Sequence, residues 1–176
     1  MDFDVSAKEF KDFETVAKEC APWVNHKTLA AIVRRESSFR QFVININYDS
    51  QGKRGYVLAR QPKNEEEAVV TARNLIKNGY NIDVGLTGVN SSNFGKYRLV
   101  VEDSFNVCKN LAVGGSIIYW NFIEALKLSP HDEQKALKVG LSMYNTGSKT
   151  RGFENGYVQK IIDSASMKVP EIKFKF

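Results

Sequence analysis

The sequence predicts a mainly α protein, of the α+β kind, with a small β-hairpin region, and three observations favour this fold class. Apolar residues recur at helical spacing along most of the 176 residues. Residues that favour helix ends, such as Asn64 and Gly79, bound several of these segments. One stretch, residues 42–59, instead combines β-branched and aromatic runs around a turn-rich centre. The length fits one domain, which we place at residues 1–167, followed by a tail at residues 168–176.

The first expected helix has an apolar stripe, and Pro22 ends it. The stripe consists of Phe10, Phe13, Val16, Ala17 and Cys20. Asn25 is a suitable N-cap for the second helix, because its short polar side chain accepts a hydrogen bond from a free backbone N–H. This second helix carries Glu36.

Asn64 is expected to begin the third helix, with Glu67 as its capping-box partner and Gly79 as its end. The most apolar stretch, residues 106–128, predicts a central buried helix, which a Ser-Pro pair closes. Its large apolar members are Leu111, Ile117, Ile118, Trp120, Phe122 and Leu126. Two more helices are expected near residues 132–142 and 156–166.

The predicted hairpin has strands at residues 43–48 and 55–59, joined by a turn at residues 49–52. The tail at residues 168–176 has few turn or helix signals, so we expect an extended or mobile end.

Composition limits the possible functions. The net charge is +5, from 25 Lys and Arg against 20 Asp and Glu, and it favours anionic partners weakly. No basic run stands out, so no nucleic-acid partner is expected. No segment has the length of a membrane span, and the start of the chain lacks the pattern of a secretory signal. Either the protein works in the cytoplasm or the sequence is the mature form of an exported one.

The two cysteines, Cys20 and Cys108, permit one disulfide. Such a bond would stabilise the fold by about 4 kcal/mol in the chain-entropy model. Two buried free thiols are an equally good interpretation of the sequence. His26 and His131 are isolated and lack the spacing of metal ligands, so we expect no metal and no cofactor.

Glu36 is the strongest candidate for a catalytic residue. It continues the apolar row of its helix, which Leu29, Ile32 and Val33 form. A carboxyl group among apolar neighbours loses hydration in its charged form, so its pKa should rise and it should keep a proton near neutral pH. A general acid needs this property. The alternative is a glutamate that turns to solvent or pairs with Arg35 or Arg40.

Two polar, glycine-bearing segments interrupt the helical pattern. The first covers residues 83–93, and the second covers residues 144–147 and continues at residues 152–158. Glycine allows close backbone approach, Asn both donates and accepts, and Tyr adds a flat apolar face. These properties suit a sugar with N-acetyl groups, although Gly and Asn are also the commonest turn residues.

Together, these segments resemble the lysozyme-like lytic transglycosylases, and above all the branch that accompanies type IV secretion and conjugation systems. The resemblance extends from about residue 20 to residue 160. Its main motifs are Glu36-Ser-Ser-Phe39, Gly85-Leu-Thr-Gly-Val-Asn90 and Tyr144-Asn-Thr-Gly147. Supporting motifs are Cys20-Ala-Pro22, Thr28-Leu-Ala-Ala-Ile32, Ala59-Arg-Gln-Pro62, Asn78-Gly-Tyr-Asn81, Asp83-Val-Gly-Leu86 and Gly152-Phe-Glu-Asn-Gly-Tyr-Val-Gln-Lys160.

The resemblance implies a lysozyme-like helical domain with Glu36 as its catalytic acid. The residues that it implies for substrate binding are Ser37, Gly85, Leu86, Asn90, Tyr144, Asn145 and Tyr157. The chain departs from the family at Gly88, where a Gln that contacts the glycan is usual. This departure puts one substrate contact in doubt.

The activity implied by the resemblance is cleavage of peptidoglycan between N-acetylmuramic acid and N-acetylglucosamine without water, which yields anhydro-muramyl products. The implied partners are glycan strands and components of a secretion or conjugation machine, in the periplasm. Ordinary glycosidases use two carboxylates. Asp49 and Asp83 are the nearest candidates for a second, but we interpret Asp49 as a turn residue and Asp83 as a loop cap. One carboxylate fits the implied reaction.

Two alternatives stay open. Gly88 is compatible with a catalytically weak or inactive component that binds peptidoglycan. The same fold also supports a lysozyme-type hydrolase.

Overall fold

The computed structural model describes residues 9–175, and the start of the chain and Phe176 lie outside them. Its helices are α1 (Phe13–Cys20), α2 (His26–Ser37), α3 (Glu65–Lys77), α4 (Phe94–Tyr97), α5 (Val107–Leu126), α6 (Glu133–Thr146), α7 (Arg151–Glu154) and α8 (Tyr157–Ser164). Its strands are β1 (Phe10–Asp12), β2 (Ile44–Tyr48), β3 (Asn81–Val84), β4 (Val89–Asn90) and β5 (Lys173–Lys175). Two 3₁₀ turns, η1 (Ser91–Asn93) and η2 (Val101–Asp103), complete the fold. The predicted mainly α fold with a small β region is therefore confirmed.

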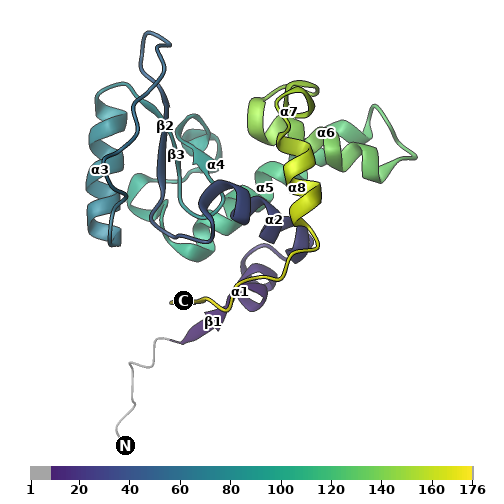
Figure 1. Cartoon of the computed structure of the whole chain (residues 1–176), viewed down its shortest axis with the longest axis horizontal. Coiled ribbons are helices and arrows are strands. Elements are labelled where there is room, and N and C mark those ends of the chain that lie inside the picture. Colours follow the sequence, from purple (N-terminus) through teal and green to yellow (C-terminus); the bar gives the residue numbers. More distant parts are fainter. Residues whose placement is uncertain (1–8, 176) are drawn as a thin grey trace, which may run out of the picture.

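Helices α2 and α5 lie at the centre of the molecule, between two lobes (Figure 1). One lobe contains the strands β2, β3 and β4 with α3, and its apolar core includes Ile44, Ile82 and Val84. The other lobe contains α6, α7 and α8, and its core includes Leu141 and Ile161. The end of α2 therefore lies where the lobes meet.

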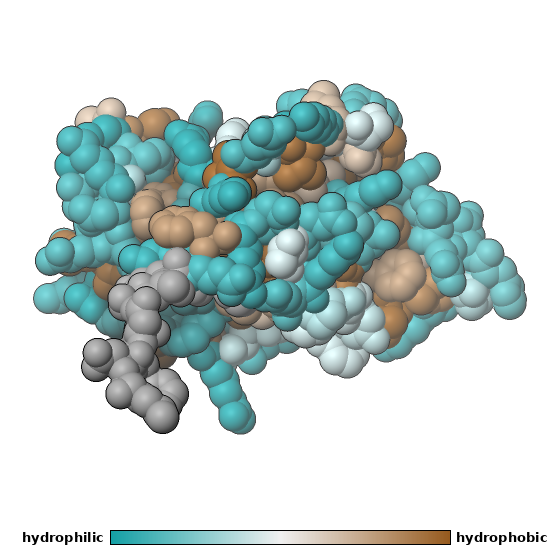
Figure 2. All heavy atoms as spheres, turned by 90° about the horizontal axis from the view of Figure 1, so that it is seen from below, coloured by the Kyte–Doolittle hydropathy of each residue, from teal (hydrophilic) through white to brown (hydrophobic). Residues whose placement is uncertain are grey.

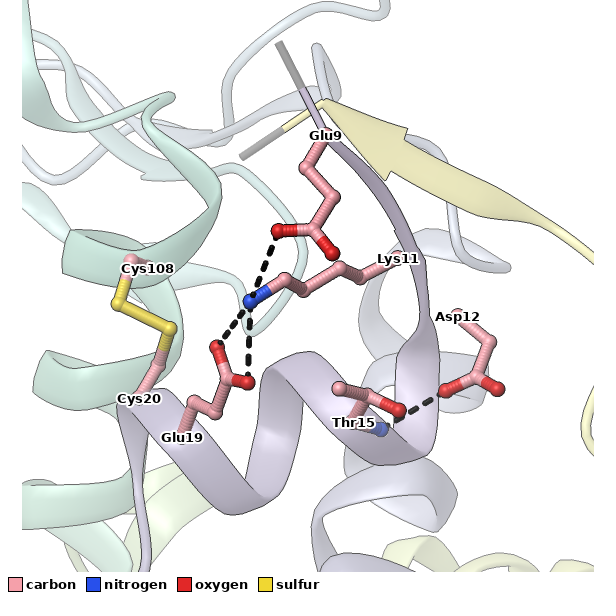
Figure 3. Close-up of polar contacts among 7 residues, drawn as sticks. All are labelled: Glu9, Lys11, Asp12, Thr15, Glu19, Cys20 and Cys108. Atoms are coloured by element: carbon pink, nitrogen blue, oxygen red, sulfur yellow. Dashed lines mark hydrogen bonds and ion pairs between the residues drawn. A yellow bond between two sulfur atoms is a disulfide. The ribbon is translucent and has the colours of Figure 1, made fainter. Parts of the chain in front are cut away.

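The N-terminal part of the fold begins later than predicted. Phe10 belongs to strand β1 and is 60% exposed, so its place in the helical stripe was wrong. Asp12 explains the difference, because its Oδ1 accepts a hydrogen bond from the N–H of Thr15 at 2.8 Å and caps α1 (Figure 3). Strand β1 pairs antiparallel with β5 in the tail, and Phe174 of β5 is buried.

Several predicted helix ends are confirmed. Asn25 caps α2 by accepting from the N–H of Lys27 at 2.9 Å, and Asn64 caps α3 by accepting from the N–H of Glu67 at 2.9 Å. Glu67 does not complete the predicted capping box, because its carboxylate accepts from the N–H of Lys63 instead. Gly79 follows α3 at φ +80°, as a helix end requires.

The predicted central helix corresponds to α5, which Asn106 caps by accepting from the N–H of Lys109. Burial along α5 is one-sided. Leu111 and Ile118 are buried, whereas Trp120 is 53% exposed. The prediction of a buried central helix is therefore confirmed for one face of α5 only.

The predicted hairpin is partly wrong. Strand β2 pairs antiparallel with β3, and residues 55–59 form no strand. The side chain of Gln61 replaces the expected partner, because its amide accepts from the N–H of Ile44 at 2.8 Å and donates to its carbonyl at 3.0 Å. The turn itself is present, since the Oδ1 of Asp49 accepts from the backbone N–H groups of Gln51 and Lys53.

Cys20 and Cys108 form a disulfide between α1 and α5 (Figure 3), so the free-thiol alternative was wrong. Nearby, the ammonium group of Lys11 contacts the carboxylates of Glu9 and Glu19. The tail lies against the domain, since Arg34 on α2 donates to the carbonyl of Lys168 at 2.6 Å. The domain boundary at residue 167 stays a prediction.

On the face that Figure 2 shows, apolar side chains form separate patches among polar ones. Within residues 9–175, no helix combines the length and the apolar character that crossing a membrane requires.

Candidate active site

A cleft of about 520 Å³ lies where the two lobes meet. Its walls come from α2, the three-stranded sheet, α4, α5 and α6. Its main polar and aromatic lining residues are Glu36, Asn47, Tyr48, Asn81, Asp83, Asn90, Asn93, Lys96, Tyr97, Asn121, Tyr144 and Asn145. Carboxamides predominate, so the cleft offers many neutral donors and acceptors beside a few titratable groups.

Glu36 lies in the last turn of α2, at the wall of this cleft. Its Oε1 accepts a hydrogen bond from the hydroxyl group of Tyr157 on α8 at 2.6 Å. Burial raises the pKa of Glu36 to about 7. The hydrogen bond from Tyr157 and the charge of Arg35 lower this pKa, whereas the charge of Asp83 raises it further. The predicted rise of the pKa is thus present, and the acid holds a proton near neutral pH.

Ser37 connects this helix to the neighbouring loop. Its hydroxyl lies within hydrogen-bond distance of the carbonyls of Leu86 (2.8 Å) and Val33 (3.0 Å). Ser37, Gly85 and Leu86 are buried, and they lie behind the cleft rather than among its lining residues. The structure therefore places these three predicted binding residues where they support the acid from behind.

Gly88 contacts the catalytic candidate directly. Residues 85–88 form a tight turn in which the N–H of Gly88 donates to the carbonyl of Gly85 at 3.2 Å. A Cβ atom at position 88 would lie 2.9 Å from the Oε2 of Glu36, and φ there is +61°. Both the space and the backbone conformation therefore favour glycine. The Gln that the resemblance implies at this position would require a different arrangement of this turn.

The side chain of Asn110 on α5 holds the same turn, a role that no local sequence pattern indicates. Its Nδ2 donates to the carbonyls of Val84 (3.0 Å) and Ser104 (2.9 Å). Its Oδ1 accepts from the backbone N–H of Thr87 (2.9 Å) and from its hydroxyl (2.8 Å). All four contacts are buried, so this one amide fixes the turn that faces Glu36.

Tyr144 and Asn145 line the cleft, but they do not lie in a loop as predicted. Helix α6 continues to Thr146, and Gly147 ends it in the left-handed conformation, at φ +69°. The hydroxyl of Tyr144 donates to the carbonyl of Thr87 at 2.6 Å, and burial raises the pKa of this phenol. A rigid helix therefore presents both side chains.

Four side chains form a hydrogen-bonded network on the opposite wall, and only Asn90 was predicted for the site. The others are Asn47 on β2 and Asn81 and Asp83 on β3. Asp83 is a strand residue rather than the loop cap that we predicted. Burial raises its pKa, and the hydrogen bonds from Asn47 and Asn90 lower it. The pairing of β2 with β3 brings these residues together. The sequence analysis did not predict this cluster, because it paired residues 43–48 with residues 55–59 instead.

Within residues 9–175, no group of three or more His, Cys, Asp or Glu is arranged to hold a metal ion. The chemistry that the cleft supports is proton transfer by the enclosed carboxyl group of Glu36, next to carboxamides that bind neutral polar ligands.

A mainly α fold with a buried glutamate of raised pKa in the cleft between two lobes defines the class of lysozyme-like domains. Residues 15–165 match the family model described as the Transglycosylase SLT domain, and the chain belongs to this family.

Two similar proteins are both named virB1. The type IV secretion system protein virB1 of Brucella abortus is 36% identical over 160 residues, which are 88% of this chain and 64% of that protein. Protein virB1 of Agrobacterium fabrum is 34% identical over 163 residues, which are 93% of this chain and 63% of that protein. The chain thus spans slightly less than two thirds of the length of these relatives. No solved structure matches it.

Proposed function

We propose that this chain is a peptidoglycan lytic transglycosylase that cleaves the β-1,4 bond between N-acetylmuramic acid and N-acetylglucosamine without water. The observation that carries the proposal is the Glu36 carboxyl group, which has a pKa of about 7 and opens onto a cleft of sugar-binding character. Membership of the transglycosylase SLT domain family supports it.

In the proposed reaction, protonated Glu36 gives its proton to the glycosidic oxygen as the bond to the anomeric carbon breaks. The resulting carboxylate then takes the proton of the primary hydroxyl of the muramyl residue. The oxygen of that hydroxyl bonds to the anomeric carbon, which closes a 1,6-anhydro ring. Glu36 regains its proton and no water is consumed, so one carboxyl group suffices.

The neighbours of Glu36 have supporting roles in this proposal. Tyr157 donates to Oε1 and fixes the orientation of the carboxyl group. Tyr144 and Asn145, on the rigid end of α6, position the acetamido group of the sugar. Asn145 is itself oriented, because its Oδ1 accepts from the Nδ2 of Asn155 at 2.8 Å. Such preorganisation lowers the cost of reaching the transition state.

We infer a periplasmic location and a role in local opening of the cell wall for a secretion or conjugation apparatus. The relatives named virB1 support the association with type IV secretion. The disulfide between Cys20 and Cys108 supports an oxidising compartment, because cytoplasmic thiols are normally kept reduced.

The test is digestion of purified peptidoglycan sacculi by the parent protein and by Glu36→Gln. The parent should release soluble fragments, and Glu36→Gln should be slower by about a hundredfold or more, because it has no proton to give. Glu66→Gln, an exposed position on α3, is the matched control and should retain parental activity.

Other outcomes would favour the alternatives. Binding to sacculi without release of fragments would indicate an inactive binding component. Cleavage that leaves only reducing muramic acid ends would indicate a lysozyme-type hydrolase. If Glu36→Gln releases fragments as fast as the parent, Glu36 is not the acid.

A further inference from the structure

Lys96 is the one positively charged side chain among the described residues that line the cleft of Glu36. It lies on α4 and is exposed. Its Nζ lies over the ring of Tyr97, 5.4 Å from the ring centroid, where an aromatic face attracts a cation. No carboxylate of residues 9–175 forms an ion pair with it. The reaction described above assigns no role to this cation.

The backbone that carries Lys96 is held in place. Helix α4 lies in the lobe that contains β2 and β3 (Figure 1). Phe94, its first residue, is buried in the core of that lobe, and the N–H of Leu99 donates to the carbonyl of Phe94 at 2.9 Å. Before α4, the Oδ1 of Asn90 accepts from the N–H of Ser92 at 3.0 Å. The wall therefore fixes where the side chain of Lys96 begins, and its exposed end is available to a ligand.

Tyr97 relates this cation to the acid. Burial is the main cause that raises the pKa of Tyr144. The charges of Glu36, Asp83 and Tyr97 raise this pKa further. Charges act strongly only over short distances, so Glu36 and Tyr97 both lie near Tyr144. Lys96, which lies over the ring of Tyr97, therefore belongs to the part of the cleft around Tyr144 and not to a remote end.

The glycan strand offers the cleft one kind of charged group. Both of its sugars carry an acetamido group, so the carboxamides that predominate in the cleft can bind either sugar. The two sugars differ at O3, where N-acetylmuramic acid alone carries a lactyl group. Carboxylates of this substituent, on the lactyl group itself or on a peptide stem attached to it, recur once in every disaccharide. A cation near the acid can therefore distinguish the two alternating glycosidic bonds, which neutral amides cannot.

We propose that Lys96 is a specificity-determining residue whose ammonium group pairs with a carboxylate of the O3 substituent of N-acetylmuramic acid. This ion pair favours the register in which the bond from N-acetylmuramic acid to N-acetylglucosamine lies at Glu36. The inference rests on the proposed transglycosylase function, because it names the group of that substrate which the cleft recognises. Lys96 takes no part in proton transfer, so its loss should weaken substrate binding and leave the chemical step unchanged.

The first test measures binding without cleavage, in protein that carries Glu36→Gln. Calorimetry compares three hexasaccharides. One contains N-acetylglucosamine alone, and two alternate it with N-acetylmuramic acid, either with free lactyl carboxylates or with peptide stems in amide linkage. One of the two acidic forms should bind about threefold more tightly than the neutral one, as a partly exposed ion pair predicts. The preferred form identifies the lactyl group or the stem as the source of the carboxylate.

Three substitutions in the same protein assign the preference to Lys96. Lys96→Gln should remove it, whereas Lys96→Arg keeps the charge and should retain it. Lys77→Gln, the same loss of charge at an exposed position of α3, is the matched control and should also retain it. The preference should disappear in about 1 M salt, where charges are screened beyond about 3 Å.

The second test uses the kinetics of cleavage, with Glu36 intact. On soluble strands that carry the preferred substituent, Lys96→Gln should raise KM about threefold and leave kcat unchanged, because the ion pair is the same in the ground state and the transition state. Lys77→Gln should change neither value. A fall in kcat without a rise in KM would overturn the role in binding.

The outcomes separate this inference from the proposed function. Equal binding of all three hexasaccharides, or a preference that persists in Lys96→Gln, would overturn the role of Lys96. The same conclusion follows if Lys77→Gln loses the preference equally. In each case, digestion of sacculi by the parent would leave the transglycosylase function standing. A cleft that binds none of the three hexasaccharides would overturn both.

Discussion

At the scale of single residues, Glu36 combines a reactive property with a cost to the fold. Its pKa is about 7 in the folded protein, against an ordinary value of 4.5. The folded state therefore binds more protons than the unfolded state between these values, and the free energy of unfolding decreases as pH rises from about 4.5 to about 7. The property that makes Glu36 an acid thus destabilises the protein at higher pH.

Glu36→Gln should therefore stabilise the protein above neutral pH while it removes activity. The neutral amide keeps an oxygen for the hydroxyl of Tyr157 and cannot ionise. At about pH 8 we expect a free energy of unfolding higher than the parental one by about 3 kcal/mol, and at about pH 4.5 no difference. Urea denaturation at both pH values measures this. A parent that is equally or more stable than the variant at about pH 8 would contradict the raised pKa.

Gly88→Ala should lower both activity and stability. The added Cβ would lie 2.9 Å from the Oε2 of Glu36, and φ +61° costs a side chain about 1 kcal/mol. Gly52→Ala is the matched control, because Gly52 has φ +76° with no atom within 4 Å of an added Cβ. Gly52→Ala should lose only the stability that the positive φ costs, Gly88→Ala should lose more because of the close contact with Glu36, and only Gly88→Ala should release sacculus fragments more slowly. Equal activity of the two variants would show that Gly88 has no special relation to the acid.

At the scale of elements, the cleft depends on the attachment of one turn to one helix. The buried amide of Asn110 on α5 bonds three groups of residues 84–87, which belong to Val84 and Thr87, and also donates to the carbonyl of Ser104. Gly88, at the end of this turn, lies next to Glu36. Helix α5 therefore determines how closely the acid is enclosed.

Asn110→Ala should destabilise the fold by about 3 kcal/mol, because it leaves several buried donors and acceptors without partners. Asn74→Ala, on the exposed side of α3, should change stability by less than about 0.5 kcal/mol. Thermal unfolding of both variants measures the difference. If Asn110→Ala unfolds like the parent, water replaces the amide and the turn does not depend on it.

The same elements show how far the sequence predicts this protein. The N-caps Asn25 and Asn64 bond backbone N–H groups two and three residues further along the chain. Local sequence patterns therefore suffice to predict where their helices begin. The partner of β2 is a distant strand, and the side chain of Gln61 occupies the place where a hairpin strand was expected. Glu36 was found because its helix is amphipathic. Asn47 was missed and Asp83 was interpreted as a loop cap, because only the pairing of strands brings them into the cleft.

At the scale of the whole molecule, the first and last elements that the structure describes hold the N-terminal side of the domain together. The disulfide joins α1 to α5 across 88 residues of sequence. Strand β5 of the tail pairs with β1, and the buried Phe174 packs near Phe13 with a centroid distance of 6.3 Å. These contacts stabilise the N-terminal side of the domain on which α2 rests.

Loss of the disulfide should lower the free energy of unfolding by about 4 kcal/mol, because the unfolded chain gains the freedom that this long loop removes. Urea denaturation with and without a reductant measures it. The variant with both Cys20→Ala and Cys108→Ala should unfold at the same urea concentration in either condition. A parental midpoint that does not respond to the reductant would contradict a stabilising disulfide.

The central claim is that Glu36 cleaves glycan strands without water, and digestion of sacculi in water enriched in oxygen-18 tests it most directly. The account predicts muramyl ends that are lighter than hydrolysed ends by one water and carry no oxygen-18, with Glu36→Gln producing almost none. Muramyl ends that carry oxygen-18 would show that water attacks the anomeric carbon, and would contradict the account.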